Sequence, residues 1–165
     1  MTIKVGEKLP DLMFTVITKE APVDKSTDEV FAGRKVVLIG LPGAFTPVCT
    51  TSHIPGYLSN MDSLKEKGVE EVVVLSVNDV FVMKAWAEFL DAMDDLTFIA
   101  DHSGEFVTQI GLEADFSSVG LGVRSGRWSM LVEDGVVQTL NIEPQPTEDD
   151  FSGAACMIEQ LGKMS

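Results

Sequence analysis

Cys49 is the residue of this 165-residue sequence whose surroundings best suit chemistry. Residues 36–41 form an apolar, β-branched run that is long enough for a buried strand and too short for most helices. Pro42-Gly43 then turns the chain. Thr46 followed by Pro47 is typical of a helix start, with an N-cap residue before a proline in the first helical position. The pattern predicts a strand, a turn and a helix whose first turn contains Cys49.

A cysteine at this position favours nucleophilic chemistry. The free N–H groups of a helix start and the positive end of its dipole stabilise an anion, so we expect this thiol to ionise more readily than free cysteine, whose pKa is about 8.5. The alternative is a small buried hydrophobe, which is the usual role of a lone cysteine. Packing alone would not require Thr46 upstream or prolines on both sides, so we favour a reactive thiolate.

The segment around Cys49 resembles a known family. Pro42, Thr46 and Cys49 are spaced Pro-x-x-x-Thr-x-x-Cys, which matches the active-site pattern of the peroxiredoxins. The longer stretch Pro-Gly-Ala-Phe-Thr-Pro-x-Cys, with His-Ile-Pro-Gly at 53–56, resembles their type II branch, typified by peroxiredoxin five. Residues 75–82 and 120–130 agree, so the resemblance covers nearly the whole chain.

This resemblance implies a thiol peroxidase that reduces hydrogen peroxide and alkyl hydroperoxides and needs neither cofactor nor metal. Cys49 would attack the peroxide, and Arg127 would hold the thiolate and polarise the substrate. From the sequence alone, Arg127 would be a solvated charge at the start of a strand. The hydroxyl of Thr46 could cap the helix, assist catalysis, or do both.

The remaining expected roles belong to the turn and the helix start. Pro42 would cover the sulfur and limit access of water. Gly43, Val48 and Cys49 would bind the substrate, with backbone N–H groups near Val48 and Cys49 facing the leaving oxygen.

Two histidines and two cysteines are the sequence's candidate soft or imidazole metal ligands: Cys49, His53, His102 and Cys156. They show neither C-x-x-C nor H-x-x-x-H spacing, so we expect no metal site. His53 lies one helical turn beyond Cys49 and could be a general base or a ligand. We favour a hydrogen-bonded structural histidine, because a cysteine at a helix start beside arginine needs no base.

Cys156 is the candidate resolving thiol. Members of the type II branch that have a resolving cysteine carry it before the last helix or on the second central strand, where this chain has Phe151 and Val74. If 151, 154, 158 and 161 form the buried stripe of the last helix, Cys156 faces solvent. We therefore expect a one-cysteine cycle with an external reductant, either glutathione with glutaredoxin or thioredoxin. A Cys49–Cys156 disulfide is the alternative.

Alternating strands and helices, then a hairpin and a helix, indicate an α/β fold. We expect strands at 12–17 (at an edge), 36–41, 72–77, 97–100, 129–133 and 136–142, with a turn at Asp134-Gly135. We expect a short helix or a turn at 26–31 and a glycine-rich loop at 115–126. Longer helices are expected from 47 to 68 with a kink at Pro55-Gly56, after Asn78 or Asp79, and from 148 to 161, and a short one from Ser103 to 110. Residues 82, 86, 89 and 90 would form the apolar face of the helix after Asn78 or Asp79. The order resembles a thioredoxin fold, with a mixed sheet covered on both faces in one domain, 1–165.

Composition limits the partners. The formal charge of −14 and a pI near 4.3 disfavour nucleic acid and anionic membranes. No apolar run approaches the length of a membrane helix, and residues 1–10 do not resemble a signal peptide. Two cysteines are too few for a disulfide framework, so we expect a cytoplasmic protein; an organelle import segment absent from this sequence is the alternative. The resemblance implies a homodimer, with Phe45 and Phe81 as candidate interface residues.

Two other functions share some of these features. A dithiol oxidoreductase would need a second cysteine close behind Cys49, where the chain has Thr51 and Ser52. A redox sensor without catalysis would keep Cys49 but would not need Thr46 or Arg127. Repeated turnover of hydroperoxide distinguishes the peroxidase from both.

Overall fold

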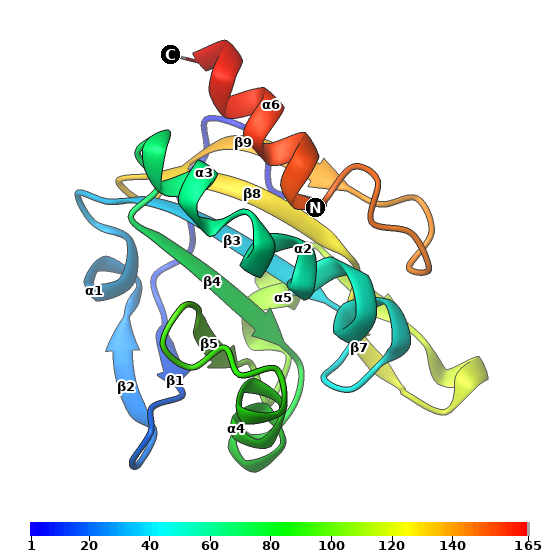
Figure 1. Cartoon of the computed structure of the whole chain (residues 1–165). Coiled ribbons are helices and arrows are strands. Elements are labelled where there is room, and N and C mark those ends of the chain that lie inside the picture. The colour runs from blue at the N-terminus through cyan, green and yellow to red at the C-terminus, as the bar shows by residue number, and fades with distance from the viewer. Residues whose placement is uncertain (165) are drawn as a thin grey trace.

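The computed structural model describes residues 1–164, which fold around a seven-stranded mixed sheet with the order β2-β1-β5-β4-β3-β8-β9 (Figure 1). Its strands are β1 (Met13–Val16), β2 (Val23–Ser26), β3 (Lys35–Leu41), β4 (Glu71–Ser76), β5 (Thr97–Ala100), β8 (Trp128–Glu133) and β9 (Val136–Ile142). A two-stranded sheet pairs β6 (Glu113–Asp115) with β7 (Val123–Ser125). The helices are α1 (Thr27–Phe31), α2 (Ile54–Ser59), α3 (Met61–Glu66), α4 (Val80–Phe89), α5 (Glu105–Gln109) and α6 (Ala154–Met164), with a π-helical turn η1 (Cys49–His53) and a 3₁₀ turn η2 (Ser117–Val119).

Strand β3 lies near the middle of the large sheet. It runs parallel to β4 and antiparallel to β8, and β4 is in turn parallel to β5. Neighbouring residues of a strand point to opposite faces, so the apolar side chains of β3 pack alternately on the two faces of the sheet. The thioredoxin-like fold class expected from the sequence, with a mixed sheet and helices on both faces, is therefore confirmed.

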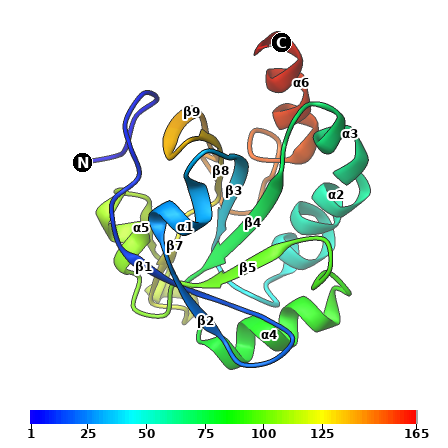
Figure 2. The same cartoon turned by 90° about the vertical axis from the view of Figure 1, so that its left-hand side faces the viewer.

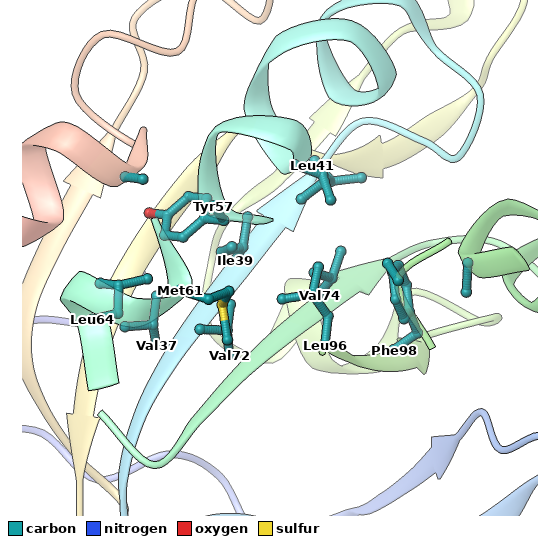
Figure 3. Close-up of a cluster of buried hydrophobic side chains, with 14 of the residues drawn as sticks. Val37, Ile39, Leu41, Tyr57, Met61, Leu64, Val72, Val74, Leu96 and Phe98 are labelled. Carbon is teal, nitrogen blue, oxygen red and sulfur yellow. The ribbon is translucent and has the colours of Figure 1, made fainter. Parts of the chain in front are cut away.

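Each face of the sheet is covered by its own set of helices (Figure 2). One core joins Val37, Ile39 and Val74 of the sheet to Tyr57 and Leu64 of α2 and α3, and it also includes side chains of α4 and α6 (Figure 3). The opposite core joins the alternate residues of β3 and β4 to α1 and α5. The side chains of β3 from Val36 to Ile39 and Leu41 are fully buried between these two cores, so packing on both faces fixes the strand that leads to the site.

Turn and capping signals in the sequence agree with the structure in several places. Asp134 and Gly135 both have positive φ, 49° and 75°, as a two-residue hairpin turn between β8 and β9 requires. Asp79 accepts a hydrogen bond from the backbone N–H of Val82 and caps α4. Ser26 and Glu29 form a capping box at the start of α1, which confirms the short helix expected there.

The prediction that the strand at 12–17 lies at an edge of the sheet is wrong. β1 lies inside the sheet, between β5 and the strand β2, which the sequence analysis did not identify. β2 has the sequence Val-Asp-Lys-Ser, which is mostly polar and exposed, because it is the true edge and buries little. The expected loop at 115–126 also contains regular structure, η2 and β7.

Two helices begin later than expected. α5 starts at Glu105 after Gly104, which has φ 71°, and its first N–H groups are bound by the carboxylate of Asp101 instead of Ser103. α6 starts at Ala154 instead of residue 148, because tertiary contacts hold 149–152 in another conformation. In α4 the buried residues are Met83, Trp86 and Ala87, whereas Phe89, expected on the apolar face, is 67% exposed.

Candidate active site

Cys49 lies where the sequence places it, in the first helical turn after β3. The turn between them holds Phe45 at φ 62°, a conformation that bulky residues rarely adopt. The Thr46 hydroxyl donates to the carbonyl of Gly43 at 2.6 Å, and the helix begins at Pro47. The Cys49 side chain is completely buried. Local sequence therefore brings Pro42, Thr46 and Cys49 together.

The helix that carries Cys49 is irregular, but the irregularity differs from the kink expected at Pro55-Gly56. The N–H of Ile54 donates to the carbonyl of Cys49, five residues back, so η1 is a π-helical turn. Pro55 has no N–H to donate to the carbonyl of Thr51, which lets the ladder widen here. The expected kink at Pro55-Gly56 is thus replaced by a π turn just before Pro55 and by a second break at Asn60, between α2 and α3.

Arg127 is buried beside Cys49, 78 residues away in the chain. It immediately precedes β8, and the pairing of Gly40 with Trp128 places it at the end of β3 from which Cys49 follows. Its guanidinium Nη2 donates to the Cys49 sulfur at 3.0 Å, and its Nε donates to the carbonyl of Pro146 at 3.0 Å. Arg127 therefore places a fixed positive charge and a directed donor next to the sulfur.

His53 is the third partner of Arg127. Its Nδ1 lies 2.8 Å from Arg127 Nη1, and its Nε2 lies 3.1 Å from the carbonyl of Ser152. Because the guanidinium can only donate, Nδ1 must accept and Nε2 must carry the proton. Burial, followed by the charge of Arg127, lowers the pKa of His53 from 6.5 to about 4, so the imidazole is neutral at pH 7. This arrangement agrees with the structural role favoured from the sequence.

Four hydrogen bonds of Ser152, with His53, Tyr57 and Glu143, were not identified from the sequence. Ser152 uses its carbonyl to accept from both His53 and the hydroxyl of Tyr57, at 3.1 and 2.7 Å. The buried carboxylate of Glu143 in turn accepts from the backbone N–H and the hydroxyl of Ser152, both at 2.6 Å. No local pattern marks these residues, because their partners come from distant parts of the chain.

A pocket of about 310 Å³ opens next to the cluster. Pro42, Thr46, Val48 and Arg127 line it together with the apolar residues Phe116, Val119 and Leu121. These three lie in the segment predicted to be a glycine-rich loop. Their only signal was that they are apolar within an otherwise polar loop, which is typical of a ligand-facing surface.

The turn before the helix is held from a neighbouring strand. Asn78, just after β4, accepts with its Oδ1 from the N–H of Ala44 at 3.0 Å and from the Ser76 hydroxyl at 2.6 Å. A Cβ at Gly43 would meet the Thr46 methyl at 3.3 Å and Arg124 Nη1 at 3.4 Å. Gly43 therefore leaves room for the close approach of these groups to the turn.

Cys156 is a free, half-buried thiol on α6, so it is less exposed than the sequence analysis predicted. The buried residues of α6 are Ala154, Met157 and Leu161, whereas Phe151, expected in this stripe, precedes the helix and is 53% exposed. Ile158 of the expected stripe packs against the same core, so the stripe differs from the expected one by the loss of Phe151 and the addition of Met157. Burial, followed by the charges of Glu159 and Glu143, raises the pKa of Cys156, which disfavours its thiolate.

The geometry suits a nucleophilic displacement by sulfur. A thiol lies 3.0 Å from a buried guanidinium, at the first turn of a helix and beside a partly apolar pocket. The guanidinium and the free N–H groups of the helix start can stabilise negative charge on a leaving oxygen. Within residues 1–164, no group of three or more His, Cys, Asp and Glu side chains is placed to hold a metal, and no helix is long and apolar enough to cross a membrane.

Comparison with known proteins gives consistent results. The sequence pattern of the Redoxin family matches residues 4–158. Rice peroxiredoxin-2C (Oryza sativa subsp. japonica) is 42% identical over 160 residues, covering 96% of this chain and 98% of the relative. The hybrid peroxiredoxin hyPrx5 of Haemophilus influenzae is 40% identical over 163 residues, covering 98% of this chain and 67% of that protein.

Solved structures agree with the sequence relatives. Reduced Prx3 of Vibrio vulnificus in complex with hydrogen peroxide superposes with a TM-score of 0.91 at 40% identity, covering 99% of this chain and 98% of the other. The chain spans about two thirds of the length of the hybrid protein and of the plant organellar relatives, and nearly all of rice peroxiredoxin-2C.

Proposed function

This chain belongs to the Redoxin family, and within it to the type II peroxiredoxins, and we propose that Cys49 is its peroxide-reducing residue and is restored by an external thiol. The observation that carries the proposal is the hydrogen bond of 3.0 Å from buried Arg127 to the Cys49 sulfur. The enzyme is a thiol peroxidase; the residues that act and the reductant are the proposed parts.

In the proposed reaction, the Cys49 thiolate attacks the terminal oxygen of a hydroperoxide. The sulfur–oxygen bond forms as the oxygen–oxygen bond breaks, and the leaving oxygen takes a proton from solvent to give water or an alcohol. Cys49 becomes a sulfenic acid. Two external thiols then return it to the thiol, with release of one water and formation of one external disulfide. Hydrogen peroxide and alkyl hydroperoxides fit the pocket, whose lining includes the apolar residues Phe116, Val119 and Leu121.

The residues around the sulfur take distinct parts. Arg127 stabilises the thiolate and then the charge that moves onto the leaving oxygen. The backbone N–H groups of Val48 and Cys49 lie in the first helical turn, where helices leave such donors without an internal acceptor, and they face the substrate. Thr46, whose hydroxyl is anchored on Gly43, accepts a hydrogen bond from the peroxide. Pro42 closes the side of the pocket and limits access of water.

Cys156 does not act as the resolving thiol in this proposal. It sits within the regular helix α6, its side chain is half-buried, and its pKa is raised by burial and by neighbouring carboxylates. A sulfenic acid on fully buried Cys49 would need local unfolding to reach it. An external thiol, either glutathione with glutaredoxin or thioredoxin, is therefore the proposed reductant.

Intact-mass measurement after one equivalent of hydrogen peroxide tests the cycle. We expect the wild type and Cys156→Ser to gain one oxygen, which glutathione converts to a glutathionyl adduct, while Cys49→Ser gains nothing at low peroxide. Loss of two hydrogens in the wild type, absent in Cys156→Ser, would show an internal disulfide and overturn the external reductant. Full turnover by Cys49→Ser would overturn the site itself.

Substitution of Arg127 tests the electrostatic part. We expect Arg127→Gln to lower the second-order rate of peroxide reduction by about a hundredfold, because a directed, charged donor is lost from the site. Arg127→Lys keeps the charge but not the planar set of donors, so it should recover only part of the rate. The rate is measured by competition for limiting peroxide. Equal rates in all three proteins would contradict this role.

We also propose that the protein is a homodimer. Phe45, Phe81 and Phe89 are 49%, 82% and 67% exposed, and the rings of Phe45 and Phe89 lie 5.6 Å apart. Phe45 follows the active-site turn, and the other two belong to α4. Exposed aromatic side chains clustered in this way favour a second protein surface over water. We define these three residues as the aromatic patch and assign it to contact between two copies of the chain.

A further inference from the structure

Residues 143–153, which connect β9 to α6, are hydrogen-bonded to the active site, and Pro146 and Thr147 of this connection also line the pocket. The Ser52 hydroxyl donates to Asp149 at 2.5 Å, and Arg127 Nε donates to the carbonyl of Pro146 at 3.0 Å. His53 and Tyr57 both donate to the carbonyl of Ser152. The connection therefore contacts both the catalytic helix and the catalytic arginine.

Glu143 fixes this connection. Its side chain is 7% exposed, and its Oε2 accepts from the N–H of Ser152, the hydroxyl of Ser152 and the N–H of Phe151, at 2.6, 2.6 and 2.9 Å. The ion pairs within residues 1–164 do not include it. A buried carboxylate is costly unless it is well hydrogen-bonded, so the donors gathered around Glu143 are what keeps it there.

We propose that Glu143 is a positioning residue for peroxide reduction, which acts by fixing Ser152 and, through His53, the guanidinium of Arg127 that holds the Cys49 sulfur. Glu143 touches neither the sulfur nor the arginine. Its effect passes along Ser152, His53 and Arg127, each joined to the next by a hydrogen bond of 3.1 Å or less. The inference rests on the function proposed for Cys49 and Arg127.

The tautomer of His53 makes this path sensitive to the position of Ser152. While the Ser152 carbonyl accepts from Nε2–H, Nδ1 keeps its lone pair and accepts from Arg127. If the carbonyl moves away, the imidazole loses the acceptor that keeps the proton on Nε2, and an Nδ1–H would face the donors of the guanidinium. Two opposed donors repel, so Arg127 would turn away from Cys49. Removing Glu143 should thus weaken the hold on the thiolate.

The test compares Glu143→Ala and Glu143→Gln with a matched control, all in the Cys156→Ser background so that Cys49 is the single thiol. Glutamine keeps the volume of the side chain but replaces one carboxylate oxygen with an NH₂ group. That group is a donor and cannot accept a hydrogen bond from Ser152 or Phe151. Gln160→Ala is the control: it removes the paired amide bonds between α6 and Asn141 of β9, at 2.6 and 2.9 Å, but no bond to His53, Tyr57 or Arg127. Each protein is measured for thermal melting, peroxide rate, and the pH midpoint of thiolate absorbance.

We expect Glu143→Ala to lower the peroxide rate roughly tenfold, the lower end of what loss of an orienting hydrogen-bond partner costs at metal sites, and to raise the midpoint of thiolate formation. Glu143→Gln should shift both in the same direction by less. Gln160→Ala should melt earlier with an unchanged rate and midpoint. Nitrogen NMR of His53 should show the Nε2–H tautomer in the parent and its loss in Glu143→Ala.

Wild-type rate and midpoint in both Glu143 variants would overturn the inference, whatever their melting temperatures. If Glu143→Ala does not fold, Glu143→Gln decides the question in the same way. A parent protein that fails to turn over peroxide would refute the proposed function instead, so the two failures are distinguishable.

Discussion

The reactivity proposed for Cys49 depends on the buried positive charge of Arg127, whose hydrogen-bond partners include no carboxylate. Arg127 is 3% exposed, and its donors are used by the Cys49 sulfur, by the neutral ring of His53 and by a backbone carbonyl. A histidine in place of a carboxylate beside the guanidinium leaves its positive charge uncompensated on that side. More of the charge is then available to hold the thiolate.

We predict that His53 makes the protein less stable in acid. Its folded pKa is about 4, against 6.5 when unfolded, mainly because of burial and then because of Arg127. Above pH 6.5 both states are neutral and stability is unaffected. As the pH falls from 6.5 to 4, the unfolded state alone takes up the proton, so the free energy of unfolding decreases, by at most about 3 kcal/mol.

Urea unfolding of the wild type and His53→Asn at several pH values measures this effect. The variant should lose the part of the slope that lies between pH 6.5 and 4, while the carboxylates of the chain contribute equally to both proteins. The hydrogen bond to the Ser152 carbonyl and the negative charges of Asp149 and Glu143 raise the pKa of His53, but they are too weak to cancel the downward shift. Parallel pH profiles in the two proteins would contradict the prediction.

Among the elements, the pairing of β3 with β8 is what assembles the site. The turn and Cys49 follow the end of β3, and Arg127 immediately precedes Trp128, the first residue of β8. The two strands approach closely at Gly40, opposite Trp128, whose indole occupies the space where another residue would carry a side chain. The indole N–H donates to the Ser125 hydroxyl at 3.0 Å, so the ring is fixed from both sides.

We predict that Gly40→Ala destabilises the fold by about 3 kcal/mol, because its Cβ would lie 2.1 Å from Cε2 of the Trp128 ring. Displacement of Trp128 should also move its neighbour Arg127 and slow peroxide reduction. Gly56→Ala is the matched control: nothing lies within 4 Å of its added Cβ, and alanine is favoured in a helix, so α2 should gain up to about 1 kcal/mol. Chemical unfolding measures both; equal stabilities would contradict the packing argument.

The molecule as a whole combines a charge of −14 with an exposed aromatic patch. Two such copies repel each other at long range, so the burial of the patch must exceed the repulsion for a dimer to form. Salt screens the charges over about 10 Å at 0.1 M while leaving apolar burial intact. The proposed dimer should accordingly become tighter as salt is added.

We predict that Phe81→Glu converts the dimer to a monomer, because it places a charge in the contact and removes the most exposed ring of the patch. Sedimentation velocity at low and moderate salt measures the state. Met13→Glu, which changes an equally apolar side chain that is 60% exposed on β1, should leave the dimer intact. A monomeric wild type, or a dimeric Phe81→Glu, would contradict the assignment of the patch.

Features encoded by neighbouring residues could be read from the chain. The apolar run of β3, the prolines of the turn and the cap-like Thr46 place Cys49 at a helix start, because strand, turn and cap preferences act over a few residues. The Asp134-Gly135 hairpin and the capping box at Ser26 follow the same rule. The family resemblance extended this to Arg127, which spacing did not connect to Cys49.

Features that depend on partners far away in the chain could not be predicted from the sequence. Arg127 reaches Cys49 across 78 residues through the register of β3 and β8, and a register is a property of two strands in three dimensions. The late start of α6 and the half-burial of Cys156 follow from contacts of Glu143 and Asp149 that hold the preceding segment out of a helix. The order of β1 and β2 and the apolar wall of the pocket likewise arise when separate segments pack together, since no single segment carries the information for its neighbours.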